Sequence, residues 1–149
     1  MPANPLISPD AIRLFMLDRK AEDNFLLDDV DMPSDLLALA MDLTVDQFNT
    51  TPPILCEQLT VETFPYRLEL LLGVTGMLLR SKAMNLTRNA LPYQSTSGTA
   101  VDDKSSRAAK YMEMATAFLS EYTDRITKIK QQMNIDSGFG YVGGPLIFR

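Results

Sequence analysis

The chain has 149 residues, of which 46% are hydrophobic and 22% charged, a composition that suits one globular domain. It holds one cysteine, no histidine and no tryptophan. These counts exclude histidine-based nucleophile pairs, histidine metal ligands, an intrachain disulfide and thiolate metal cages. The net charge of −5 has the wrong sign for a general nucleic-acid binder.

The start of the chain has no basic region followed by a long apolar run, so it does not resemble a signal peptide. The most apolar segment, residues 68–79, is well short of the ~20 residues that a membrane helix needs. We therefore expect a soluble chain made in a reducing cytoplasm, with Cys56 as a free, partly buried thiol.

Two helices are predicted in the first third of the chain. Ser8 is a good N-cap, and Pro9 suits the first position of a helix that runs through Ala11–Lys20. A second helix opens with Ser34 as N-cap and runs to about Phe48. Its predicted buried stripe, at helical spacing, comprises Leu37, Met41, Thr44 and Phe48, widened by Leu36, Ala40 and Leu43.

Pro52 and Pro53 forbid further helix, and residues 54–63 fit either a short helix or an extended stretch. A third helix, Tyr66–Asn89, is nearly apolar all round through Leu79 and is predicted to be the most buried. Gly73 and Gly76 lie inside it, where each costs about 1 kcal/mol relative to alanine. Close approach of another helix or subunit is the physical reason to keep them.

Residues 90–103 contain a Ser-Gly turn signal and fit either a small β-hairpin or a flexible loop. Asp102 or Asp103 then caps a long fourth helix, Lys104–Asn134, whose far end, residues 127–134, we expect to project. The predicted fold class is therefore all-α, a bundle of about four helices occupying residues 1–134. The nine methionines are assigned to its core as gap-filling side chains.

The last segment, residues 135–149, combines four glycines with apolar side chains. A merely disordered tail is poor in such side chains, so we predict an extended arm that docks on another chain. Folding back onto its own domain remains an alternative. The candidate docking residues are Phe139, Tyr141, Val142, Leu146, Ile147 and Phe148.

No cluster of residues points to catalysis or to a cofactor. The acidic run at residues 28–31 lacks the spacing of a calcium loop, and nothing fixes the separation of Glu57 and Glu62 for acid–base work. We expect no enzyme, no metal and no cofactor. Arg80, Lys82 and Arg88 fit either the solvated end of a buried helix or a set of bases facing DNA in a channel.

Charge divides unevenly along the chain. Residues 1–62 carry twelve acidic and three basic side chains, a net charge of −9, whereas residues 63–149 carry a net charge of +4. Oppositely charged parts of one chain can associate between copies or with neighbouring proteins, although two solvated helix faces give the same pattern.

The layout of the chain resembles the head–tail connector, or neck adaptor, proteins of tailed bacteriophages. The resemblance covers most of the chain and depends on structural rather than catalytic motifs. These motifs are Arg13-Leu-Phe-Met-Leu-Asp-Arg19, Asn24-Phe-Leu-Leu-Asp-Asp29, Gln47-Phe-Asn-Thr-Thr-Pro-Pro53, Thr63-Phe-Pro-Tyr-Arg67, Gly73-Val-Thr-Gly76 and Leu78-Leu-Arg80.

The resemblance implies a helical subunit, made in the host bacterial cytoplasm, that assembles in the virion neck as a ring of about twelve copies. It implies contacts with the portal protein and with a tail or neck protein. DNA would pass through the ring without specific binding, and no membrane is involved. The alternatives are a tail-completion or baseplate structural protein, or a small helical regulatory module that binds a host protein.

Overall fold

The computed structural model describes residues 7–16, 18, 32–54, 58–88 and 103–139. Within these ranges the only regular elements are four helices: α1 (Pro9–Met16), α2 (Ser34–Thr50), α3 (Arg67–Arg88) and α4 (Asp103–Phe139). The all-helical prediction is thus confirmed for the described chain. Residues 89–102, where a hairpin or loop was predicted, lie outside it.

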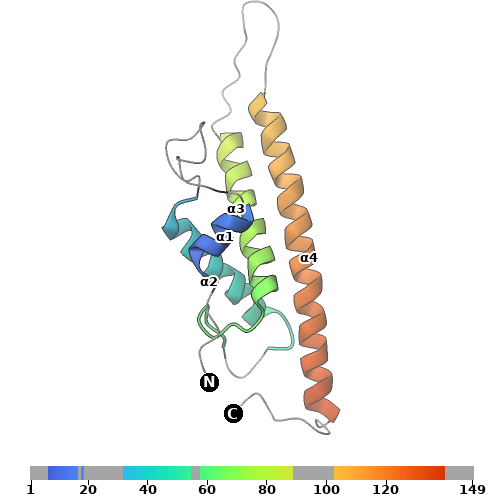
Figure 1. Ribbon diagram of the computed structural model, residues 1–149. Helices are drawn as coiled ribbons and strands as arrows, with labels where there is room; N and C mark the ends of the chain where they lie inside the picture. The colour runs from blue at the N-terminus through green and yellow to red at the C-terminus, as the bar shows by residue number, and fades with distance from the viewer. Residues whose placement is uncertain (1–6, 17, 19–31, 55–57, 89–102, 140–149) are drawn as a thin grey trace, which may run out of the picture.

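The helix α3 is the centre of the bundle. It contacts each of the other three helices, and α4 runs antiparallel along it as its main neighbour. Figure 1 shows α1 crossing in front of α3 and α4 extending past the lower end of α3. The ring of Phe15 in α1 lies 6.3 Å from that of Phe118 in α4, centroid to centroid. The expectation that α3 is the most buried helix is confirmed by an almost unbroken run of buried residues, from Leu70 to Leu79 with only Leu71 and Met77 partly exposed.

Two apolar clusters hold the helices together. The first joins α1, α2 and α3 around Ile12, Leu37 and Val74, all with no exposed surface. The second joins the end of α2 to α3 and to the lower half of α4 around Phe48, Tyr122 and Ile126, which are also fully buried. All the α4 residues of these two clusters belong to the second.

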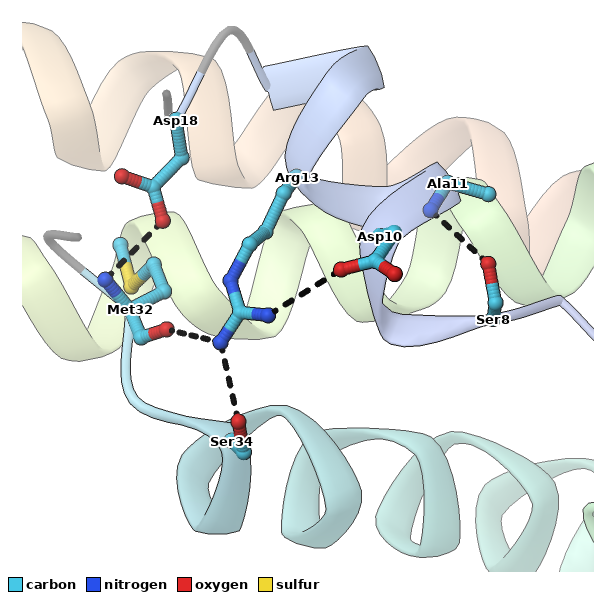
Figure 2. Close-up of polar contacts among 7 residues, drawn as sticks. All are labelled: Ser8, Asp10, Ala11, Arg13, Asp18, Met32 and Ser34. Atoms are coloured by element: carbon cyan, nitrogen blue, oxygen red, sulfur yellow. Dashed lines mark hydrogen bonds and ion pairs between the residues drawn. The ribbon is translucent and has the colours of Figure 1, made fainter. Parts of the chain in front are cut away.

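Helix α1 starts as predicted but ends earlier. The Ser8 hydroxyl accepts a hydrogen bond from the Ala11 backbone N–H at 3.2 Å, as an N-terminal cap does. The helix was expected to reach Lys20, yet α1 ends at Met16 and Asp18 is not helical. The Asp18 carboxylate instead accepts the backbone N–H of Met32 at 3.1 Å. A tertiary contact thus takes up the residue that the local pattern assigned to the helix (Figure 2).

The start of α2 corrects the prediction for Ser34. Pro33 occupies the N-cap with extended backbone, and Ser34 is the first helical residue and makes no side-chain cap. Its hydroxyl accepts a hydrogen bond from the Arg13 guanidinium at 3.0 Å, and the same guanidinium nitrogen donates to the Met32 carbonyl at 3.1 Å. Figure 2 shows how Arg13 connects α1 to the start of α2 in this way.

The buried stripe of α2 is confirmed at its four central positions, Leu37, Met41, Thr44 and Phe48. Leu43 was expected to widen that stripe, but its side chain is 47% exposed. Thr44 faces α3, and Leu43 lies about 100° away from it around the helix, beyond the edge of the contact.

Helix α4 is longer than predicted at its C-terminal end. The sequence predicted that residues 135–149 form an extended arm, but residues 135–139 continue α4 to Phe139. The expected projection of residues 127–134 is wrong for the first turn, where Lys130 has no exposed surface and Ile129 packs against the second core. It holds beyond that turn, because residues 131, 132 and 134–136 are exposed and α4 extends past the lower end of α3 (Figure 1). The segment before α3 packs against the second core. Described residues 58–66 contain a turn at Thr60–Thr63 and supply Phe64 and Tyr66 to that core.

Candidate assembly surface

A solvent-open groove of about 740 Å³ runs between α3 and α4. Gly76 of α3 contacts Leu119 of α4, and because the helices are antiparallel, Arg80 lies level with Thr116 and Met84 level with Met112. The groove is lined by Arg80, Met84, Met112, Ala115, Thr116, Leu119, Ser120, Thr123 and Asp124.

The floor of the groove is apolar and its rims are polar. Met84 is 59% exposed and Met112 39% exposed, so two flexible thioether side chains face solvent at one end. Arg80 is exposed beside them, and Asp124 lies about 18 Å from Met112 along α4, at the other end. An exposed apolar strip rimmed by polar residues is one form that protein-binding surfaces take.

These methionines correct a prediction. The sequence assigned the methionines to the core, yet Met84, Met112 and Met114 are all among the exposed large hydrophobic residues. Methionine side chains adapt their shape to different partners, which makes them common on binding surfaces. The spacing of the methionines in the sequence does not indicate that they are exposed, because the burial of a helical position depends on which element lies beside it.

The three bases predicted at the end of α3 do not share one face. Arg80 lines the groove, whereas Lys82 lies two residues further and therefore about 200° around the helix. The Lys82 ammonium lies 5.0 Å from the centroid of the Tyr111 ring, in a cation–π contact with α4. Arg88 is exposed at the last position of α3.

Gly73 and Gly76 lie where neighbouring helices come closest to α3. A Cβ atom on Gly73 would overlap Cγ2 of Thr44 on α2 and lie 3.2 Å from the Tyr122 ring on α4. A Cβ atom on Gly76 would lie 2.7 Å from Cγ of Leu119. The two glycines thus let α2 and α4 approach α3 from within the same chain.

On the side of α4 that faces α2, the helices close around two polar side chains. The buried Tyr122 hydroxyl donates a hydrogen bond to the Thr44 carbonyl at 2.6 Å and so joins α4 to α2. Burial, with a smaller contribution from the charge of Glu69, raises the pKa of the Tyr122 phenol above its ordinary value. That phenol therefore stays neutral at any physiological pH and acts as a hydrogen-bond donor.

Lys130 is the second polar side chain in this region. Its ammonium donates to the Pro53 carbonyl at 3.2 Å and lies 4.3 Å from the centroid of the Phe48 ring. Burial lowers the pKa of Lys130, because the charged form loses its hydration. The contacts compensate part of that loss, and the lysine anchors the chain after α2 to α4. Sequence reasoning missed this role, since a lysine near the end of an amphipathic helix usually indicates a solvated face.

The remaining candidates give no further site. Among the described residues, no group of three or more potential metal-ligating side chains comes together. Glu62 is exposed, whereas Cys56, Glu57 and the acidic run at 28–31 lie outside the described residues. Of the predicted docking residues, Phe139 ends α4, and Tyr141, Val142, Leu146, Ile147 and Phe148 also lie outside.

No described helix combines the length and the hydropathy that crossing a membrane requires. Comparisons with known proteins add no family to this description, since no protein-family model, curated protein or solved structure matches the chain.

Proposed function

We propose that this chain is a structural assembly subunit, and specifically a neck adaptor that forms a ring joining the portal of a tailed bacteriophage to its tail. The observation that carries the proposal is the open groove between α3 and α4, with Met84 and Met112 exposed along it. An apolar strip left open between two packed helices offers a second protein a surface to cover. The phage setting comes from the resemblance of the sequence layout.

The charge distribution supports the same function. An adaptor ring has to let DNA slide past it, and a subunit with a net charge of −5 does not retain a polyanion. Subunits in a closed ring use two different surfaces, one on each side, and this chain has an acidic first part and a basic second part.

The experiment is co-expression of the full chain with the portal protein of the same phage genome, followed by native mass measurement of the purified complex. The expected result is a complex that carries about as many copies of this chain as a ring requires, roughly twelve. A portal that purifies without the chain would contradict the neck assignment. A stable one-to-one complex with a host protein, absent from particles, would favour the regulatory alternative.

The C-terminal segment is tested in the same assay. We expect removal of residues 140–149, all beyond the end of α4, to leave the helical content unchanged and to abolish portal attachment. A chain with Leu146, Ile147 and Phe148 changed to serine should behave in the same way. A matched control changes Gly143 and Gly144 to serine and keeps every apolar side chain. Attachment at wild-type levels by the truncated chain would exclude a docking role for this segment.

A further inference from the structure

The outer face of α2 is a second exposed apolar strip. Leu39 is 54% exposed and Leu43 is 47% exposed. They lie about 140° and 100° around the helix from Thr44, which faces α3, so they point away from the bundle. Every charged residue of α2 is acidic and exposed: Asp35, Asp42 and Asp46.

The groove has the opposite charge at its methionine end. After Glu69, α3 carries three bases and no acid, and Arg80 and Arg88 are both exposed. Arg80 is itself a lining residue of the groove, and Met84 lies one helical turn after it, beside Met112.

We propose that the outer face of α2 in one copy docks into the methionine end of the α3–α4 groove in a second copy. Leu39 and Leu43 would cover Met84 and Met112, while the aspartates of α2 face Arg80 and Arg88. Both partners are exposed apolar strips of the same chain, and their charges are complementary. This inference rests on the proposed function as a self-assembling subunit, and it names the two surfaces that meet.

The charges also determine which pairing forms. If two α2 faces met, the three aspartates of one copy would face the three aspartates of the other. If two grooves met, arginine would face arginine. Like charges repel, so neither symmetric contact is favoured. The α2 face cannot fill the groove of its own chain, because Leu37 and Phe48 fix the opposite side of α2 in the core. When copies join through two different surfaces, one α2 face and one groove stay free at the two ends of the assembly. Further copies therefore add until a ring closes.

Cysteine crosslinking between two chains tests the contact. Two proteins are made in a Cys56→Ser background, one with Leu43→Cys and one with Met84→Cys, and they are distinguished by mass. On mild oxidation, the mixture is expected to give a 43–84 heterodimer at several times the yield of either homodimer. The matched control replaces Leu43→Cys with Leu68→Cys, since Leu68 is also 47% exposed. Equal yield from the control, or a dominant homodimer, would overturn the proposal.

Charge reversal gives a second readout. The pair Asp42→Lys and Asp46→Lys on the Leu43→Cys chain should lower the heterodimer yield several-fold, and Arg80→Glu on the Met84→Cys chain should restore it. Circular dichroism confirms that each variant is helical, and Lys128→Glu, at an exposed position of α4, serves as the control for added charge. Failure of Arg80→Glu to restore the yield would contradict the charge pairing.

Two further outcomes separate this inference from the proposed function. If no 43–84 crosslink forms but the chain still joins the portal as a ring, the neck assignment stands and this interface fails. A 43–84 crosslink in a chain that ignores the portal would support the interface and reject the neck assignment.

Discussion

The two ends of the α3–α4 pair differ in how they are packed. At the closed end, around Gly73, α2 crosses close to both helices, and Phe48 and Tyr122 have no exposed surface. At the open end, around Arg80 and Met84, no third described helix covers the pair, and a groove remains. The same two helices are therefore a core in one half and a surface in the other.

This difference shows what determines which part of α4 is buried: the position of α2 and of the segment before α3. Phe64 and Tyr66 stack edge-on and tilted around Phe48, with ring centroids 5.1 Å and 5.7 Å from its own. Lys130 adds a cation over the same ring. At the open end the corresponding contact is longer and stands beside exposed methionines: the Lys82 ammonium lies 5.0 Å from the Tyr111 centroid, against 4.3 Å for Lys130 and Phe48.

The largest expected effect compares one side chain from each end. Phe48→Ala should lower the free energy of unfolding by about 3–5 kcal/mol, because it leaves a cavity under three aromatic and cationic contacts. Met84→Ala should change it by no more than about 0.5 kcal/mol, since that side chain is already largely in solvent. Urea unfolding followed by circular dichroism measures the free energy of unfolding of both variants. Similar losses in the two variants would contradict the difference in packing between the closed and the open end.

The next effect tests the close approach at Gly73. Gly73→Ala should cost about 2 kcal/mol, because the new methyl group overlaps Cγ2 of Thr44, which is held in place by a 2.7 Å hydrogen bond from its hydroxyl to the Ala40 carbonyl. Thr44→Ser removes that methyl group and keeps the hydroxyl. The double variant should recover much of the loss, whereas purely additive costs in a double-mutant cycle would reject the steric cause.

Gly76→Ala provides the matched comparison on the same helix. A new Cβ would lie 2.7 Å from Cγ and 2.9 Å from Cδ2 of Leu119, whose side chain is only partly buried and lines the groove, and 3.2 Å from the backbone nitrogen of the same residue. Leu119 can move into the open space, and alanine favours the helix by about 1 kcal/mol, so we expect a smaller cost than at Gly73. A larger cost at Gly76 would show that the open end is less adaptable than its exposure indicates.

A third prediction concerns pH. The folded-state pKa of Tyr122 is raised above the ordinary 10.0, so the unfolded chain loses this proton first as pH rises. The contribution of Tyr122 to stability is therefore complete below pH 10 and is lost as the pH rises further. Tyr122→Phe should cost about 1 kcal/mol at pH 8, through loss of the bond to the Thr44 carbonyl, and should flatten the decline above pH 10.

Lys130 also makes stability depend on pH, with a sign opposite to that of Tyr122. Because Lys130 is present in both wild type and Tyr122→Phe, its contribution cancels when the two are compared. Its folded-state pKa is lowered, so its contribution becomes more favourable as pH rises towards 10.5. Tyr66, whose pKa is also raised, provides the control: Tyr66→Phe should retain most of the decline. An equally steep decline in Tyr122→Phe would assign the alkaline sensitivity to another group.

The smallest effect is a gain. Thr75 is buried in α3, and its hydroxyl has no hydrogen-bond partner among the described residues. Thr75→Val keeps the shape and removes the desolvated hydroxyl, so it should raise the free energy of unfolding by about 1 kcal/mol. Thr123→Val is the control, because the Thr123 hydroxyl is exposed and donates to the Leu119 carbonyl at 2.8 Å. A loss of stability in Thr75→Val would reveal a partner for that hydroxyl.

Periodicity in the sequence was enough to place the four helices, the central position of α3 and most of the buried stripe of α2. It also singled out Gly73 and Gly76, since a glycine inside an apolar helix is costly unless something packs closely against it. These properties follow from local spacing, which is the same wherever the helix lies in the molecule.

Only the tertiary structure decided that Ser34 binds Arg13 instead of capping its helix, that Lys130 is buried and that Met84 and Met112 are exposed. In each case the outcome depends on which element lies beside the residue. A helical pattern identifies a face that can be covered, but the crossing of α2 over α3 and α4 determines where that cover ends. The groove begins at that limit, so the candidate assembly surface follows from helix arrangement and not from any motif.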